Sequence, residues 1–178
     1  DRESYIKHIP KKSITKMVDQ GFIATTDFEK INSIDAIVIC VPTPLGIHNE
    51  PDLTYIKSTL ELLRNDIRKN QILILESTTY PGTTSEEIVP IIEKLGYEIG
   101  KTFYIGYSPE REDPNNKKYN LENIPKICSG YSRYCKKLTS HLYKKILKKV
   151  KNVTDINVAE FVKLYENIYR SVNIGLVN

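Results

Sequence analysis

Short apolar runs alternate with longer amphipathic stretches along the chain. Runs that are apolar on both faces and rich in β-branched residues predict buried strands, here at residues 34–41, 72–75, 103–107 and 124–129. Shorter strands are expected at 22–25 and near Val153. Apolar positions three and four residues apart predict helices, here over residues 10–20, 52–69, 84–96, 131–150 and 158–178.

Strands and helices that alternate with short connections predict an α/β fold with a doubly wound, mainly parallel sheet. A long helix over residues 158–178 follows this sheet. Ligands of such sheets gather beyond the carboxyl ends of the strands. Three predicted strands end in polar or proline-rich turns, at 42–46, 76–84 and 108–114, so these turns are the first candidates for a binding site.

The stretch from residue 72 to residue 88, ILILESTTYPGTTSEEI, connects a predicted strand to a predicted helix. Pro81 and Gly82 favour a turn, and Thr84 and Glu87 have the spacing of a capping box that starts a helix. A hydroxyl-rich turn at this place is typical of a ligand-binding corner. An ordinary strand-to-helix connection has the same pattern, so the local sequence leaves both interpretations open.

Composition narrows the class of protein. The 178 residues suffice for one sizeable core, or for one domain and the start of a second. A hydrophobic content of 40% with 27% charged residues is ordinary for a soluble globular protein, and no apolar run reaches the ~18 residues of a membrane span.

The three cysteines, Cys40, Cys128 and Cys135, lack the spacing of a zinc site or a disulfide framework. We therefore expect reduced thiols, a cytoplasmic location and no metal site. Cys40 falls inside an apolar run, so we expect it to be buried and unreactive.

The net charge of +4 is modest, but seven lysines crowd the segment from 136 to 151. A solvated helix face and a nucleic-acid-binding patch both fit such a cluster. The solvated face is favoured, because no DNA- or RNA-reading motif accompanies the lysines.

Four polar residues in the last predicted helix, Glu160, Lys163, Asn167 and Arg170, are spaced three, four and three residues apart. A helix places them in one stripe. The stripe is either the solvent-exposed face of an amphipathic helix, or a site where Lys163 and Asn167 point donors at one oxygen.

Two further turns carry candidate chemistry. Glu110 comes just after a predicted strand, where a carboxylate suits a general base or a group that positions water; a surface ion pair in a loop fits equally. Thr43 lies between two prolines and offers a hydroxyl on a rigid turn, although a plain turn has the same sequence.

Together these motifs resemble those of the UDP-glucose/GDP-mannose dehydrogenases, the nucleotide-sugar 6-dehydrogenase family. The resemblance extends over most of the chain, through CVPTPLG at 40–46, ESTTYPGTT at 76–84, SPEREDP at 108–114, IPKICSG at 124–130 and AEFVKLYENIYRSVNIGLVN at 159–178. The forms SPEREDP and ESTTYPGTT are most similar to the branch that oxidises UDP-N-acetylhexosamines.

The resemblance implies oxidation of a sugar C6 hydroxyl to a carboxylate in two hydride transfers that reduce two NAD. A cysteine attacks the aldehyde in this family, the second hydride transfer oxidises the adduct to a thioester, and water hydrolyses the thioester. It also implies a Rossmann-like NAD-binding domain over residues 1–155. Residues 156–178 would begin the central helix that joins two domains and forms a homodimer. A UDP-sugar is then the expected partner, and neither nucleic acid nor a membrane is.

The family motifs imply roles for individual residues. Lys163 and Asn167 would stabilise the oxyanion, and Thr79 and Glu110 would hold or activate the hydrolytic water. The residues that would line the NAD are Val41, Pro42, Thr43, Glu76, Ser77 and Thr78. Those that would contact the substrate are Glu110, Arg111, Lys163 and Asn167.

The chain departs from the family pattern in three places. Many members have a second glutamate where this chain has Pro114. The glycine-rich phosphate-binding turn belongs upstream of Asp1, and the catalytic cysteine and sugar domain belong downstream of Asn178. We therefore expect a fragment of a longer protein that is inactive by itself, in which residues 22–25 lack strand neighbours and 34–41 form an open edge.

Two other classes of function remain as hypotheses. One is a non-catalytic dimerisation module built on the helix at 158–178. The other is a basic nucleic-acid-binding module that uses residues 136–151.

Overall fold

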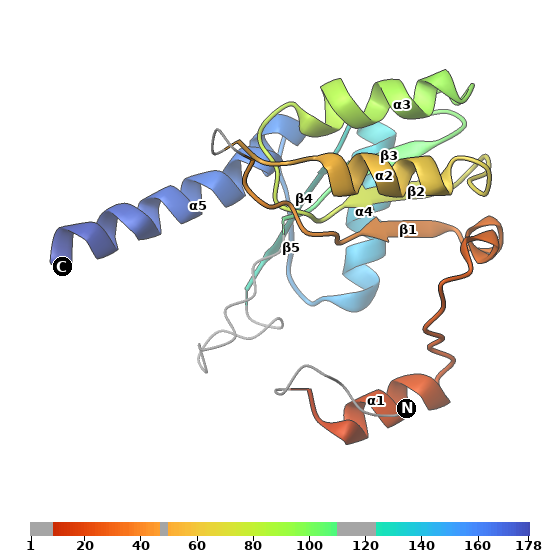
Figure 1. The fold of residues 1–178 in the computed structure, drawn as a ribbon, viewed down its shortest axis with the longest axis horizontal. Helices are drawn as coiled ribbons and strands as arrows, with labels where there is room; N and C mark the ends of the chain where they lie inside the picture. Colours follow the sequence, from red (N-terminus) through yellow and green to blue (C-terminus); the bar gives the residue numbers. More distant parts are fainter. Residues whose placement is uncertain (1–8, 47–49, 110–123) are drawn as a thin grey trace.

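The computed structural model describes residues 9–46, 50–109 and 124–178, and its core is a five-stranded sheet with helices on both faces (Figure 1). The strands are β1 (Ala36–Ile39), β2 (Ile72–Leu75), β3 (Tyr104–Tyr107), β4 (Lys126–Gly130) and β5 (Val150–Asn152). The helices are α1 (Lys11–Asp19), α2 (Thr54–Leu63), α3 (Val89–Lys94), α4 (Arg133–Ile146) and α5 (Ile156–Val177). A 3₁₀ helix, η1 (Phe28–Ser33), precedes β1, and a π-helical turn, η2 (Thr83–Ile88), precedes α3.

The strands lie in the order in which they occur along the chain, from β1 to β5. β1, β2 and β3 are parallel, with Ile37 opposite Leu73 and Leu73 opposite Ile105. β4 runs antiparallel to β3, and β5 runs parallel to β4. The prediction of a Rossmann-like, mainly parallel α/β fold is confirmed, and the reversal at β4 is the feature that the sequence pattern did not indicate.

The four apolar residues of β2 are buried because each face of the sheet is covered by helices. Leu73 and Leu75 belong to the core that includes α2 and α3, whereas Ile72 and Ile74 pack with Tyr143 of α4. Figure 1 shows α2 and α3 near each other, with α4 behind the sheet. Successive side chains of a strand point to opposite faces, and burying one such side chain contributes ~1.5–3 kcal/mol.

The helix predicted over 52–69 has an apolar stripe at three- and four-residue spacing, and all five of its members are buried: Leu53, Ile56, Leu60, Leu63 and Ile67. The helix ends at Leu63, earlier than the predicted residue 69. The Asp52 side chain, just before the N-cap residue Leu53, accepts a hydrogen bond from the Thr54 N–H at 2.8 Å. The Thr54 side chain, and after it this N–H, lower the pKa of the Asp52 carboxyl.

Residues 22–25 do not form the predicted strand. Phe22 and Ile23 are 49% and 69% exposed, and α1 has no buried residue and lies apart from the sheet (Figure 1). β1 is an edge strand, as predicted for the run at 34–41. A strand needs a neighbour to pair its backbone groups, and the described part of the chain supplies none for residues 22–25.

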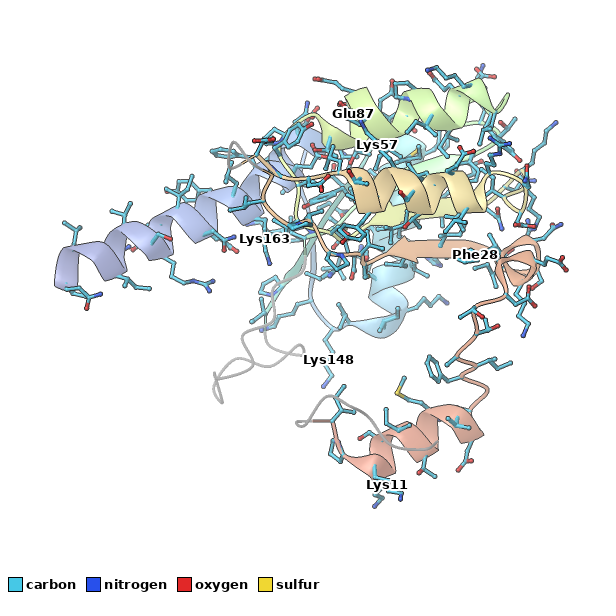
Figure 2. All side chains as sticks on the ribbon, in the orientation of Figure 1. Lys11, Phe28, Lys57, Glu87, Lys148 and Lys163 are labelled. Carbon is cyan, nitrogen blue, oxygen red and sulfur yellow. The ribbon has the colours of Figure 1, made fainter. Side chains whose placement is uncertain are left out.

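The predicted capping box of Thr84 and Glu87 is wrong. The segment begins as η2 and continues as α3, and Gly82 precedes it with a left-handed φ of 98°. The Glu87 carboxylate lies 2.7 Å from the Lys57 ammonium of α2, and Figure 2 shows the two side chains between α2 and α3. This ion pair raises the pKa of Lys57, and Thr84 has a different partner, described below.

The last helices differ slightly from their predicted bounds. α4 ends at Ile146 because Val150 already belongs to β5, and α5 begins at Ile156, where the Asp155 side chain accepts from the Asn157 N–H at 2.8 Å. Within the ranges that the structure describes, none of the helices combines the length and apolar character needed to cross a bilayer.

Candidate functional site

The turns that follow β1, β2 and β3 are tied together at one edge of the sheet. The Glu76 N–H donates to the Ile39 carbonyl at 2.9 Å, and the Ser77 hydroxyl donates to the Val41 carbonyl at 2.7 Å. The Ser108 N–H donates to the Leu75 carbonyl at 3.0 Å. Two of the three predicted turns, at 42–46 and 76–84, therefore meet at the carboxyl ends of parallel strands, the ligand-binding edge of such folds.

Glu76 is held by side chains from the far half of the sheet. Its Oε1 lies 2.8 Å from the Lys126 ammonium of β4 and accepts a hydrogen bond from the Tyr143 hydroxyl of α4. Its Oε2 accepts from the Cys40 thiol at 3.5 Å. The Glu76 and Lys126 side chains are 14% and 10% exposed, so solvent screens the pair little.

The Tyr143 ring completes this group, which we call the Glu76 cluster (Cys40, Glu76, Lys126 and Tyr143). The Lys126 ammonium lies 5.2 Å from the centre of the ring, within the range of a cation–π contact. Burial, followed by the hydrogen bond to Glu76, raises the pKa of the Tyr143 phenol well above its ordinary value. The phenol therefore stays a neutral donor to the carboxylate.

Thr79 follows the same turn and is 3% exposed. Its Oγ1 has no hydrogen-bond partner at normal geometry in the described chain, although it lies near enough to the Tyr107 hydroxyl to lower that group's pKa. Burial outweighs this effect and raises the pKa of Tyr107 to about 12. A buried hydroxyl with spare hydrogen-bonding capacity can hold a water molecule.

A second carboxylate, Glu160 of α5, lies at the other side of the β2 turn and is fully buried. Its Oε2 accepts from the Gly82 N–H at 2.7 Å, and its Oε1 accepts from the Thr84 N–H at 2.8 Å and the Thr84 hydroxyl at 2.6 Å. We call these residues the Glu160 anchor (Gly82, Thr84 and Glu160). Burial raises the pKa of Glu160, against the three hydrogen bonds, which lower it.

The polar stripe predicted along α5 is thus divided between two environments. Glu160 is buried, Lys163 is half-buried, and Asn167 and Arg170 are exposed. Figure 2 shows Lys163 on the part of α5 next to the sheet, before the helix extends away from it. Neither prediction for the stripe, a solvated face or a pair of donors, anticipated a buried carboxylate.

The thiols differ from expectation at one position. Cys40 is exposed, so the prediction that it is buried is wrong: it follows the last residue of the edge strand β1 rather than lying inside it. Cys128 and Cys135 are buried, and burial raises the pKa of Cys128 to about 11. Among the described residues, no group of His, Cys, Asp or Glu is arranged to hold a metal ion.

The lysines between 136 and 151 are mostly exposed on and after α4, as a solvated helix face requires. Lys136 is half-buried, and its ammonium donates to the Thr154 carbonyl at 3.2 Å. Glu110, Arg111 and the rest of the predicted turn after Pro109 lie outside the described residues.

Comparison with known proteins decides the family. Residues 2–147 match the model of the NAD binding domain of the UDP-glucose/GDP-mannose dehydrogenase family. The chain belongs to this family. The resemblance seen in the sequence motifs is therefore confirmed.

Two curated relatives are similar to most of this chain. It is 40% identical over 156 residues to the UDP-N-acetyl-D-glucosamine 6-dehydrogenase of Salmonella typhi, covering 86% of this chain and 37% of that protein. It is 40% identical over 165 residues to Protein CapL of Staphylococcus aureus, covering 92% and 39%. The chain thus spans about two fifths of the length of these relatives.

The solved structure of the UDP-D-ManNAc dehydrogenase of Pyrococcus horikoshii resembles the fold closely. Its TM-score is 0.86 at 30% sequence identity, and the match covers 95% of this chain and 41% of that one. The arrangement of sheet and helices described above is therefore shared with that dehydrogenase.

The residues expected to line the NAD lie in the turns at the carboxyl edge. In the turn after β1, Val41 and Thr43 are half-buried and Pro42 is exposed. In the turn after β2, Ser77 is buried and Thr78 is exposed. The two turns are joined by the Ser77 hydrogen bond, so they offer one continuous rim of backbone and hydroxyl groups.

The sequence analysis did not identify Lys126 or Tyr143 as residues of the site. It named Glu160, but it did not predict that Glu160 is buried and binds the turn after β2. The hydroxyl of Tyr143 lies 67 positions from its partner Glu76, and Glu160 lies 76 and 78 positions from Thr84 and Gly82. No local spacing carries a signal over such separations. A charged residue within an apolar run, as Glu160 is between Ala159 and Phe161, is the one hint available.

Proposed function

We propose that the protein containing this chain is an NAD-dependent nucleotide-sugar 6-dehydrogenase. It oxidises the C6 hydroxyl of a UDP-sugar, UDP-N-acetylglucosamine or UDP-N-acetylmannosamine, to the uronic acid used in surface polysaccharides. Family membership and the similarity to a UDP-N-acetyl-D-glucosamine 6-dehydrogenase support this substrate class. The observation that carries the proposal is the junction of the turns after β1 and β2 at the carboxyl edge.

The proposed cofactor rim consists of Val41, Pro42, Thr43, Glu76, Ser77 and Thr78. NAD, when bound, supplies the hydride acceptor for each oxidation. Thr43 and Thr78 offer hydroxyl groups, and Ser77 holds the two turns together through Val41. The Glu76 carboxylate is bound by Lys126 and Tyr143, so the side chain is held in one position at the rim.

The proposed chemistry on the substrate side belongs to Lys163 and Asn167 of α5, one turn apart. Both side chains can donate hydrogen bonds to a developing oxyanion, and such a donor lowers a barrier by ~3–4 kcal/mol. Thr79 would position the hydrolytic water, and its unpartnered, buried Oγ1 supports that role. Glu110 would assist it, and Arg111 would contact the substrate.

We further propose that residues 1–155 belong to the NAD-binding domain and that 156–178 begin the central helix of a homodimer. The helix supports this assignment because large apolar side chains are exposed along it: Phe161, Tyr165, Ile168, Val172 and Leu176. We place the reaction in the cytoplasm, because Cys40, Cys128 and Cys135 lack the spacing of a disulfide framework.

A stoichiometry and a substitution test this function. The purified full-length protein is incubated with NAD and each UDP-N-acetylhexosamine, and NADH is followed by absorbance. Two NADH per uronic acid are expected, and Lys163→Ala should lower kcat by ~10²-fold or more. Lys137→Ala, at an exposed position of α4, is the matched control.

Three outcomes would contradict the proposal. The absence of NADH with every UDP-sugar would reject the enzyme class. One NADH per sugar would reject the four-electron oxidation. An unchanged kcat in Lys163→Ala would remove that residue from the mechanism.

A further inference from the structure

The Glu160 anchor joins two elements that carry different parts of the site. Gly82 and Thr84 belong to the turn that also carries Thr79, and Glu160 belongs to the first turns of α5, which carries Lys163. The three hydrogen bonds are 2.6 to 2.8 Å long and buried. The cofactor edge and the donor-bearing helix are therefore connected directly through one carboxylate.

The geometry of the turn explains why a carboxylate fits there. Gly82 has a φ of 98°, a left-handed conformation that favours glycine. The Gly82 and Thr84 N–H groups then converge on the same carboxylate, one on each oxygen. The Thr84 hydroxyl adds a third donor, so the two oxygens of Glu160 are occupied by one short segment.

The anchor lies at the only buried stretch of α5. The buried residues of this helix are Ile156, Ala159 and Glu160, and the side chains beyond them are half-buried or exposed. Ile156 and Ala159 pack into the core shared with Tyr107 and fix the depth of the first turn. Apolar contacts of this kind are not directional, whereas three hydrogen bonds to two oxygens fix an orientation as well.

Orientation matters because the proposed catalytic donors lie farther along the helix. Lys163 is ~4.5 Å and Asn167 ~10 Å beyond Glu160 along the helix axis. A tilt of ~10° about the anchor would move Asn167 by ~2 Å. Misplacing a catalytic group by about 1 Å can lower a rate ~10²-fold.

We propose that Glu160 is a positioning residue, whose buried carboxylate sets the direction in which α5 leaves the sheet and thereby places Lys163 and Asn167 over the carboxyl edge. The inference rests on the proposed function, because it assumes that these two donors act on the substrate. Glu160 itself contacts no substrate atom in this scheme, and its effect passes through α5.

The test compares four variants of the full-length protein. Glu160→Gln keeps the size of the side chain but offers one carbonyl oxygen to three donors. Thr84→Val removes one donor at constant volume, and Thr84→Ser keeps it. Glu93→Gln, on the exposed surface of α3, is the control for loss of a negative charge.

Two readouts are measured for each variant: steady-state kinetics with NAD and the UDP-N-acetylhexosamine, and amide hydrogen exchange over residues 80–88. Glu160→Gln should lower kcat at least 10-fold, while KM for NAD changes less than 2-fold. Exchange at Gly82 and Thr84 should become faster. Thr84→Val should show a smaller loss of kcat, and Thr84→Ser and Glu93→Gln should resemble the wild type.

The outcomes separate this inference from the proposed function. A folded Glu160→Gln variant with wild-type kcat overturns the positioning role, as does an equal loss in Glu93→Gln. If Glu160→Gln does not fold, the contrast between Thr84→Val and Thr84→Ser decides instead, and equal kcat values overturn the role. If the wild type oxidises no UDP-sugar, the proposed function fails, and faster exchange in Glu160→Gln then supports the anchor alone.

Discussion

Two carboxylates flank the turn after β2, and the protein stabilises them by different means. Glu76 faces a lysine ammonium and a tyrosine hydroxyl, and 14% of its side chain remains exposed. Glu160 is fully buried, and its three partners are two backbone N–H groups and one hydroxyl of a single turn. The first arrangement joins distant strands and a helix, and the second orients one helix against one turn.

Glu76 and Glu160 differ in how many hydrogen-bonding or charged partners remain after one side chain is removed. Without Lys126, Glu76 would keep a negative charge in a nearly closed site, which is expensive in free energy. Without the Thr84 hydroxyl, Glu160 would still accept two N–H groups, because those belong to the backbone. We therefore expect the Glu76 cluster to be the more sensitive of the two to a single side-chain change.

The largest expected effect is that of Lys126→Met. Removing one partner of a buried pair typically costs ~3–5 kcal/mol, and partial exposure reduces this to ~2–4 kcal/mol in the free energy of unfolding. Urea denaturation would measure it. The double variant Lys126→Met/Glu76→Gln should recover more than half of the loss, since no unpaired charge is left.

A matched control is Lys101→Met. Its ion pair with Glu98 has side chains 73% and 60% exposed, so this change should be close to neutral. Equal losses in Lys126→Met and Lys101→Met would show that the Glu76 cluster is screened like a surface pair, and the contrast between the two carboxylates would disappear.

A smaller effect is expected for Thr84→Val in the Glu160 anchor. A hydrogen bond to a charged group contributes ~1.5–3 kcal/mol to the free energy of unfolding, and valine preserves the volume of threonine. Urea denaturation of Thr84→Val beside Thr84→Ser would measure the hydroxyl separately from the methyl group. A larger loss in Thr84→Ser than in Thr84→Val would assign the role of this residue to packing.

The smallest effect is a dependence on pH. Because burial raises the pKa of Glu160, the folded protein binds this proton more tightly than the unfolded chain does. The stability contributed by protonation is complete below the ordinary pKa of 4.5 and is lost as the pH rises through the raised value. The stability of the wild type relative to Glu160→Gln should therefore be greatest at acidic pH and decline toward neutral pH.

Thermal denaturation of the two proteins between pH 4 and pH 8 would check this sign. If the wild type instead gains on Glu160→Gln as the pH rises, the three hydrogen bonds outweigh burial.

Much of the fold could be predicted from local sequence patterns. The run ILIL at 72–75 is buried on both faces, the stripe of α2 faces the core, and the run at 34–41 lies at the edge of the sheet. The turns at 42–46 and 76–84 were expected at the carboxyl ends of strands, and the structure joins them there because neighbouring parallel strands end at the same edge.

The hydrogen-bond and ion-pair partners of polar side chains were much harder to predict from the sequence. Thr84 and Glu87 have the spacing of a capping box, yet Thr84 bonds to Glu160 of α5 and Glu87 to Lys57 of α2. Residues 22–25 have the composition of a strand, yet they are exposed beside no strand of the described chain. In each case the local sequence favours one structure, but the contacts available in the folded protein determine the structure that forms.

The sequence by itself indicated the family, the buried strands and the apolar stripe of α2. Apolar periodicity reports burial directly, because a side chain's hydrophobicity does not depend on which neighbour covers it. Tertiary structure alone decided that Lys126 and Tyr143 contact Glu76. It also decided that Glu160 is buried and binds the turn after β2, while the rest of its polar stripe faces solvent or is half-buried. A hydrogen bond or an ion pair requires one particular partner at one distance and angle, and that partner is chosen by the fold.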